Sequence, residues 1–265
     1  MKKLFYPARM SLLSLLSLLS LSCLLSMTTA QAASQFAAQL PDVSQMLKAT
    51  DQLRVGGGNM QVETEITTFQ RDGSVEKERK YRVYSQAQRQ SLVLMQSPAE
   101  KGQKVLMSGD DFWMLLPGSQ RPMRITPMQK LLGDASVGDI ATMNWAEDYQ
   151  ASLVAEEKCD DKACLHLRLD ASRKSLAYQH IELWIGKKFY EPLKADLYVQ
   201  SEKLAKQARF VMDKAQAPTA VVEMLLADQL SNHKETRIRY LQRQPKTVPE
   251  QWLNPMFLAK NPTLE

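Results

Sequence analysis

Apolar and polar residues alternate with a period of two over most of the chain beyond residue 59. Seven segments have apolar side chains at every second position: 60–68, 80–83, 165–169, 181–185, 193–199, 208–212 and 236–240. This alternation predicts β-strands that bury one face and expose the other. Four shorter runs are apolar on both faces, which favours strands covered on both sides: 91–95, 104–107, 112–116 and 220–226.

Turn-forming residues separate these runs at hairpin-like spacing. Clusters of Gly, Pro, Asp and Ser stand at 71–74, 97–98, 109–111, 117–119, 186–188 and 217–218. The spacing predicts about ten strands joined by tight turns. No long linker or low-complexity stretch divides them, so we expect one large antiparallel sheet or barrel rather than two domains.

Helices are predicted to be few and short. Apolar residues recur at helical spacing in residues 41–54, 127–132, 139–145 and 249–258, and Gly56-Gly57-Gly58 ends the first of these segments. Four such helices cannot form a second full layer. The pattern therefore predicts an α+β chain, mainly antiparallel β, with a single curved sheet forming a half-open β-barrel that a few short helices cover.

The first 32 residues read as an export signal. Lys2, Lys3 and Arg9 precede an apolar run over residues 11–25, and small residues follow up to Ala32. A basic start, a short apolar run and a small-residue site predict a signal peptide over residues 1–32, cleaved after Ala32, and a single domain over residues 33–265. The run of about 15 residues is short of the ~20 that span a bilayer. Lipid attachment at Cys23 is the alternative.

Much of the positive net charge belongs to this segment and would be removed with it. The whole chain carries +5 with a pI near 9.0, which by itself suggests a nucleic acid or an anionic membrane as partner. Cleavage removes three cations and no acids, leaving +2. The remaining clusters mix both signs, and no interleaving of basic and aromatic residues occurs, so we expect no nucleic-acid partner.

Cys159 and Cys164 form an even pair in the exported chain. They flank four turn-prone residues between two alternating stretches, so a disulfide would close the mouth of a β-hairpin. A metal site with His166 is the alternative, but it lacks a fourth ligand at recognisable spacing. We therefore expect a disulfide and no metal.

Catalytic motifs are not found in the sequence. His166, His180 and His233 fall on polar faces of predicted strands, and no metalloprotease motif, phosphate-binding loop or dinucleotide-binding loop occurs. Residues 134–138 approach a nucleophile elbow but lack its first Gly and a preceding buried strand. The acidic pairs at 110–111 and 160–161 are typical of turns. These observations predict a protein that is not an enzyme and has no cofactor.

Several motifs in order along the chain resemble the outer-membrane lipoprotein-sorting family, the LolA-like proteins. Residues 109–125 resemble the family's strand with Gly-Asp, Trp and Pro followed by a basic stretch, and residues 132–140 resemble its Gly, Ser and Asp helix start. Further matches lie in residues 190–198, 218–228 and 248–258. The resemblance spans nearly the whole exported chain.

This resemblance implies an incomplete antiparallel barrel around an apolar cavity that carries acylated cargo through the periplasm. At ~0.8 kcal/mol per buried methylene, an acyl chain of about sixteen carbons gains on the order of 12 kcal/mol from shelter, before ordering costs. We expect the cavity wall at Val62, Ile66, Tyr81, Val83, Leu94, Trp113, Leu115, Leu183, Ile185, Leu197 and Val199. We expect a lid at Met46, Leu47, Leu132, Ile140 and Trp145, with Arg121 and Arg124 at the rim.

The resulting hypothesis is a monomeric periplasmic carrier or chaperone. It would bind lipoprotein acyl chains or a free lipid and pass them, without catalysis, from an inner-membrane exporter to an outer-membrane acceptor. The alternative is a sensing or accessory module of an inner-membrane lipid exporter, in which the cavity recognises a ligand without transporting it.

Overall fold

The computed structural model describes residues 42–70, 72–141, 144–228 and 235–260. The predicted signal peptide, Cys23 and His233 lie outside the described residues. Residues from Asp42 onward form one compact unit, and the following description concerns that unit alone.

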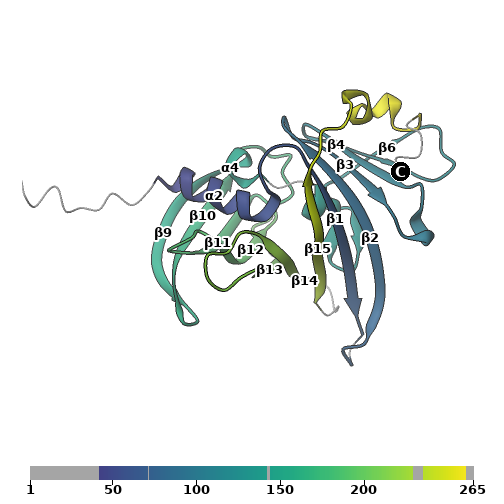
Figure 1. The fold of residues 1–265 in the computed structure, drawn as a ribbon. Coiled ribbons are helices and arrows are strands. Elements are labelled where there is room, and N and C mark those ends of the chain that lie inside the picture. Colours follow the sequence, from purple (N-terminus) through teal and green to yellow (C-terminus); the bar gives the residue numbers. More distant parts are fainter. Residues whose placement is uncertain (1–41, 71, 142–143, 229–234, 261–265) are drawn as a thin grey trace, which may run out of the picture. The chain divides into compact units, whose positions relative to one another are not determined.

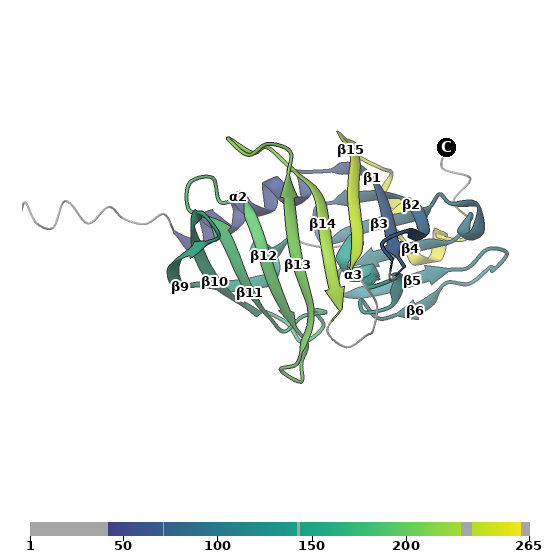
Figure 2. The same cartoon turned by 90° about the horizontal axis from the view of Figure 1, so that it is seen from below.

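In the part of the chain that the structure describes, thirteen strands form one antiparallel sheet (Figures 1 and 2). The order across the sheet is β6-β5-β4-β3-β2-β1-β15-β14-β13-β12-β11-β10-β9. The first half of the sheet consists of β1 (Met60–Phe69), β2 (Val75–Gln86), β3 (Gln90–Met95), β4 (Lys104–Ser108), β5 (Asp111–Leu115) and β6 (Met123–Ile125). The second half consists of β9 (Tyr149–Cys159), β10 (Lys162–Ala171), β11 (His180–Gly186), β12 (Pro192–Tyr198), β13 (Leu204–Met212), β14 (Val221–Asp228) and β15 (Thr236–Pro245).

The two halves are meanders that meet where β1 pairs with β15. Within each half, strands that follow one another along the chain are neighbours in the sheet, which is the arrangement that hairpin connections produce. β6 and β9 stand at the two ends of the order, so the sheet is open and is not a closed barrel. The mainly antiparallel β architecture predicted from the alternation is confirmed.

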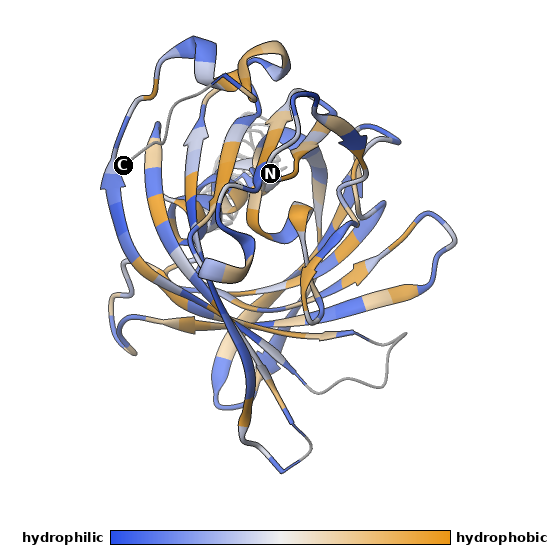
Figure 3. Cartoon of the chain, turned by 90° about the vertical axis from the view of Figure 1, so that its right-hand side faces the viewer, coloured by the Kyte–Doolittle hydropathy of each residue, from blue (hydrophilic) through white to orange (hydrophobic). Residues whose placement is uncertain are grey.

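Alternation gives the sheet two different faces, and Figure 3 shows hydrophobic and hydrophilic residues alternating along the strands. One face, here called the inner face, carries a large buried cluster to which the helices contribute Met46, Leu47 and Trp145. A second cluster involves the outer face of β2 to β5 and the C-terminal segment: Tyr84, Leu92, Leu94, Leu106, Leu115, Val248, Leu253 and Leu258. The apolar runs in β3 to β5 are therefore covered on both sides.

Three α-helices are described, and all three pack on the inner face. α2 (Val43–Val55) is capped by Asp42, whose carboxylate accepts the Ser44 N–H, and it ends at Gly56 with a φ of 82°. It packs against β9, β12, β14 and α4 (Trp145–Asp148), whereas α3 (Val137–Ala141) packs against β2, β3 and β4. The helices thus cover parts of both meanders.

Two of the predicted helices have a different form. Residues 139–145 hold the end of α3 and the start of α4 rather than one helix, and residues 249–258 hold two short 3₁₀ helices, η2 (Glu250–Leu253) and η3 (Pro255–Phe257). A further 3₁₀ turn, η1, spans Pro98–Glu100. η2 packs against β3 and β4 on the outer face, as the C-terminal segment in Figure 1 shows.

The predicted helix over residues 127–132 is wrong. The segment is a turn followed by β7 (Lys130–Leu132), which pairs with β8 (Ala135–Ser136) in a small second sheet. Gly133 allows this turn, because it has a φ of 55° and because a Cβ there would stand 2.5 Å from side-chain atoms of Thr236 and Thr68. The close approach fixes the hairpin against β15 and β1.

Candidate functional site

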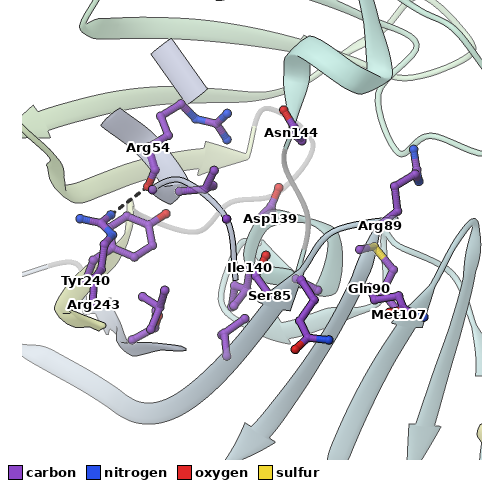
Figure 4. Close-up of a pocket in the computed structure, with 18 of the residues that line it drawn as sticks. Arg54, Ser85, Arg89, Gln90, Met107, Asp139, Ile140, Asn144, Tyr240 and Arg243 are labelled. Atoms are coloured by element: carbon purple, nitrogen blue, oxygen red, sulfur yellow. Dashed lines mark hydrogen bonds between the residues drawn. The ribbon is translucent and has the colours of Figure 1, made fainter. Parts of the chain in front are cut away.

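A partly enclosed pocket of about 220 Å³ lies between the inner face and the helices (Figure 4). Strand residues form one side of it: Val62, Thr64, Val83, Ser85, Met107, Phe210, Val221, Tyr240 and Arg243. Helix residues and their flanks form the other: Arg54, Val55, Gly56, Asp139, Ile140, Ala141, Asn144, Glu147 and Asp148. The end of β2, the turn after it and the start of β3 contribute Gln86, Ala87, Arg89 and Gln90. The lining combines apolar side chains with polar and charged ones, as in a site for an amphiphilic small molecule.

The C-terminal end of α2 is held to α4 by a buried polar junction. The Arg54 guanidinium forms an ion pair with Asp51 at 2.7 Å and lies 3.4 Å from the centre of the Trp145 ring. Asp51 also accepts the Ala146 N–H at 2.7 Å. Burial raises the pKa of Asp51 to about 6, although Arg54 opposes the shift. The junction joins two helices that contribute to the pocket.

α3 is held to the sheet by a second buried network. Asp139 accepts the Ser136 N–H at 2.8 Å, as in a helix capping box, and forms an ion pair with Lys206 of β13 at 2.5 Å. The Tyr178 hydroxyl donates a hydrogen bond to the other carboxylate oxygen of Asp139 at 2.7 Å. Burial, and then the charge of Asp139, hold the pKa of Tyr178 well above its usual range, so the hydroxyl remains a donor.

α4 is tied to the β2–β3 turn. Asp148 at the end of α4 forms ion pairs with Arg89, which lies in that turn, and with Arg173. Arg89 also pairs with Asp110 at 3.1 Å. Burial raises the pKa of Asp148, and the nearby Arg89 opposes this shift. The carboxylates Asp139 and Asp148 at the pocket are therefore each paired with a cation.

Arg243 reaches the pocket because of a β-bulge. Ile66 pairs with Ile238 and Thr64 with Tyr240, but the register shifts between Thr64 and Glu63, so that Val62 lies opposite Arg243. Without the shift, strict alternation beyond Tyr240 would place residue 243 on the outer face. The bulge turns the arginine onto the same face as Val62 and Tyr240, where it lines the pocket.

Most residues predicted for the cavity wall and lid lie on the inner face. Val62, Val83 and Ile140 line the pocket. The others belong to the inner cluster around it, either fully buried or partly buried against it: Ile66, Tyr81, Leu183, Ile185, Leu197, Val199, Met46, Leu47, Leu132 and Trp145. Contact of these residues with a ligand stays a prediction.

The structure corrects the prediction for Leu94, Trp113 and Leu115. These three belong to the outer cluster under η2 and the C-terminal segment, not to the wall of the pocket. Their neighbours in the chain, among them Val93 and Met114, are the inner-face residues. Both sets are apolar, because both faces of these strands are covered, so alternation alone could not assign the faces.

The two predicted rim arginines do not line the pocket. Arg124 of β6 forms an ion pair with Asp111 at 2.5 Å and lies 4.9 Å from the centre of the Trp113 ring. Arg121 is exposed in the preceding loop. Both are therefore at the β5–β6 edge of the sheet rather than at the pocket rim.

Sequence reasoning missed the charged residues that line the pocket or pair with its lining residues. Lys206 is two residues before Ala208 and four before Phe210 on β13, so the alternation already placed this lysine on the buried face of the strand. Arg54 lies in the last turn of α2, and the sequence predicted that this helix ends at residue 54 but not that the arginine would be buried. For Arg243 no local signal was available, since the bulge depends on pairing with β1.

The predicted disulfide joins Cys159 and Cys164 near the tip of the β9–β10 hairpin. Within the described ranges, no group of three or more His, Cys, Asp or Glu side chains could hold a metal ion. No described helix is long and apolar enough to cross a membrane.

Comparison with solved structures defines the class of fold. A LolA superfamily protein from Nitrosomonas europaea is 28% identical over 79% of this chain and 96% of its own, with a TM-score of 0.72. A putative outer membrane lipoprotein-sorting protein domain from Vibrio parahaemolyticus is 19% identical, covering 82% of this chain and 97% of its own, with a TM-score of 0.65. A DUF1329 family protein from Desulfovibrio piger is 21% identical over 80% and 95% of the two chains, with a TM-score of 0.64.

The chain has the fold of the LolA superfamily and of lipoprotein-sorting proteins, which confirms the resemblance seen in its sequence. Residues 87–260 also match a protein-family model whose description reads "Uncharacterized protein", and the chain belongs to that family. A search among curated proteins found no match.

Proposed function

We propose that this protein is a periplasmic carrier that shelters acyl chains of lipoproteins, or of a free lipid, and passes them between membranes without covalent chemistry. The observation that carries the proposal is the partly enclosed pocket between the apolar inner face of the sheet and the three helices. The LolA-like fold supports the same function. In this proposal the sheet acts as a half-open barrel and the helices act as its lid.

The size of the pocket requires the lid to move during binding. About 220 Å³ is less than the roughly 300 Å³ at the lower end of the range for ligand sites. An acyl chain would therefore displace helices rather than fill an existing void. α3 and α4 have five and four residues, too few to be stable as isolated helices, so they depend on the contacts that a ligand would replace.

The charged groups around the pocket favour transport over catalysis. Asp139 is paired with Lys206, and Asp148 with Arg89 and Arg173. Ion pairs of this kind fix the helices in position, whereas a general acid or base must be free to exchange protons with a substrate. We therefore propose that the pocket contains no catalytic group.

The compartment and partners follow from the same proposal. A signal peptide over residues 1–32 would deliver the domain to the periplasm, where a disulfide such as Cys159–Cys164 persists. An exporter in the inner membrane would supply the acyl cargo, and an acceptor in the outer membrane would receive it.

The test compares pocket variants with matched surface variants. Ile140→Glu places a charge in the pocket, and Val83→Phe fills part of it. Val75→Glu and Val75→Phe are the controls, because Val75 is on the same strand as Val83 but is 54% exposed. Native mass spectrometry of protein purified from the periplasm should find lipid on the wild type and on both Val75 variants, and at least tenfold less on the pocket variants.

Transfer distinguishes a carrier from a sensor. Wild-type protein loaded with lipid should deliver it to acceptor vesicles, and the rate should fall with Ile140→Glu. Lipid that binds but never leaves would contradict the carrier function. An absence of co-purified lipid, together with no uptake from donor vesicles, would contradict lipid binding altogether.

A further inference from the structure

Arg243 differs from the other two arginines that line the pocket. Arg54 is paired with Asp51, and Arg89 with Asp148 and Asp110. Among the described residues, no carboxylate lies within 4.0 Å of a nitrogen of Arg243. Its Nη2 donates to the backbone carbonyl of Arg54 at 2.9 Å, while its Nε is buried and has no hydrogen-bond partner within the described ranges.

The surroundings of Arg243 leave its positive charge poorly compensated. Burial lowers its pKa, and the nearby Tyr240 opposes this shift, while Arg54 lowers the pKa further and Asp213 raises it slightly. The Tyr240 ring lies against the guanidinium, with 4.7 Å between Cζ of Arg243 and the centre of the ring. A buried N–H donor without an acceptor costs free energy that an incoming acceptor would recover.

An apolar row starts beside this arginine. Val62 lies directly opposite Arg243 across β1 and β15, Val83 lies opposite Val62, and Val93 lies opposite Val83. Because residues in register share a face, the cation and the row of valines face the same side of the sheet, and Val62 and Val83 line the pocket with it. The site therefore joins a polar donor group to an apolar surface. Figure 4 shows Arg243 beside Tyr240 and hydrogen-bonded to Arg54.

We propose that the pocket takes an acyl chain that ends in an anionic group, a carboxylate or a phosphate, and that Arg243 binds that group. This inference rests on the proposed function and specifies its ligand. A planar guanidinium donates to two oxygens of a carboxylate or phosphate at once, so the β-bulge that aims Arg243 into the pocket also selects the ligand's polar end. An acyl chain with an uncharged end would lack this contact.

The test uses ligands that share a twelve-carbon chain and differ at the polar end. Dodecanoate, dodecyl phosphate, dodecanol and dodecylamine compete for the pocket with the neutral fluorescent probe N-phenyl-1-naphthylamine. Wild-type protein should bind one or both anions at least tenfold more tightly than dodecanol, and dodecylamine more weakly still. The ranking of the two anions identifies carboxylate or phosphate as the preferred group, and inorganic phosphate alone should not displace the probe.

Three variants assign the preference to Arg243. Arg243→Gln should reduce the difference between anion and alcohol to less than twofold while dodecanol binds as before, and Arg243→Lys should keep part of the difference. Arg239→Gln is the matched control, since Arg239 lies on the same strand, is half exposed and is paired with Glu65. It should leave all affinities unchanged. Thermal unfolding of each variant shows whether the fold is intact.

Each outcome decides between the two proposals. Equal affinity of wild type for dodecanoate, dodecyl phosphate and dodecanol would overturn the role of Arg243 and leave the carrier function standing. The same conclusion follows if folded Arg243→Gln retains the preference or loses dodecanol equally. Failure of every twelve-carbon ligand to bind would overturn the proposed function, and this inference with it.

Discussion

Two buried ion pairs lie at the inner cluster, and each includes a side chain that contacts another element. Lys206 projects from the sheet to Asp139 of α3, with only 2% and 1% of the two side chains exposed. Asp51 of α2 pairs with Arg54 and caps Ala146 of α4. Buried ion pairs contribute little net stability, but removal of one partner leaves an uncompensated charge, so they restrict where the helices can sit.

Asp51 should make the stability of the protein depend on pH. Its pKa of about 6 in the folded state lies above the ordinary 3.8, so the folded state binds the proton more tightly than the unfolded state does. This carboxyl therefore adds stability as the pH falls through 6, and the gain is complete below about 3.8. Between pH 7 and pH 4.5 the gain from this group is about 2 kcal/mol.

Asp51→Asn removes this titration and keeps an oxygen that can accept the Ala146 N–H. We expect the free energy of unfolding of the wild type to rise by about 2 kcal/mol relative to that of Asp51→Asn when the pH is lowered from 7 to 4.5. Urea denaturation at the two pH values measures the difference. Parallel pH profiles for the two proteins would show that Asp51 titrates normally in the folded state.

At the level of elements, alternation in the sequence was sufficient to predict most strands but not the face that each one buries. Strands with one polar face, such as β10 and β11, were assigned correctly, with Leu183 and Ile185 in the inner cluster. In β3 and β5 both faces are apolar, and the choice of Leu94 and Leu115 as inner residues was wrong. The buried faces of these strands could not be assigned, because the outer face is covered by the C-terminal segment, which is distant in the sequence.

The C-terminal segment should therefore stabilise the fold without contributing to ligand binding. Leu258 is fully buried in the outer cluster, whereas Met256, two residues earlier, is 79% exposed. Leu258→Ala should lower the free energy of unfolding by about 2–4 kcal/mol, because it leaves a cavity against β3 to β5. Met256→Ala should change it by less than about 0.5 kcal/mol.

Denaturation with urea measures both variants, and lipid binding is measured under conditions where each is folded. We expect both to bind lipid as the wild type does, since the outer cluster and the pocket are on opposite faces of the sheet. Loss of lipid binding by folded Leu258→Ala would show that the two faces are coupled.

At the scale of the whole unit, the pocket lies where the two meanders join. Val62 and Arg243 face it from the paired strands β1 and β15, while Met107 and Phe210 contribute from either side of that seam. Residues so far apart in the sequence form no local motif. The sequence could predict an apolar inner face from periodicity, but the pocket's position and its charged groups depend on the β1–β15 register and on the bulge within it.

The lid should respond to a ligand as a unit distinct from the sheet. α3 and α4 are too short to be stable alone, and the pocket beneath them is smaller than an acyl chain requires, so ligand binding must open and then reorder them. Hydrogen exchange measured with and without dodecanoate should show altered protection in 43–55, 137–141 and 145–148. Amides of β3 and β4, whose outer face η2 covers, should not change.

The Arg243→Gln variant is the control for this exchange experiment, because dodecanoate should then protect the lid only at higher concentration. A uniform increase in protection over the whole sheet would instead indicate that the ligand stabilises the fold globally by mass action, with no separate movement of the helices. Protection confined to the C-terminal segment would place the ligand on the outer face and contradict the pocket as the binding site. Local change in the helices is the expected result, because the ligand enters between them and the inner face of the sheet.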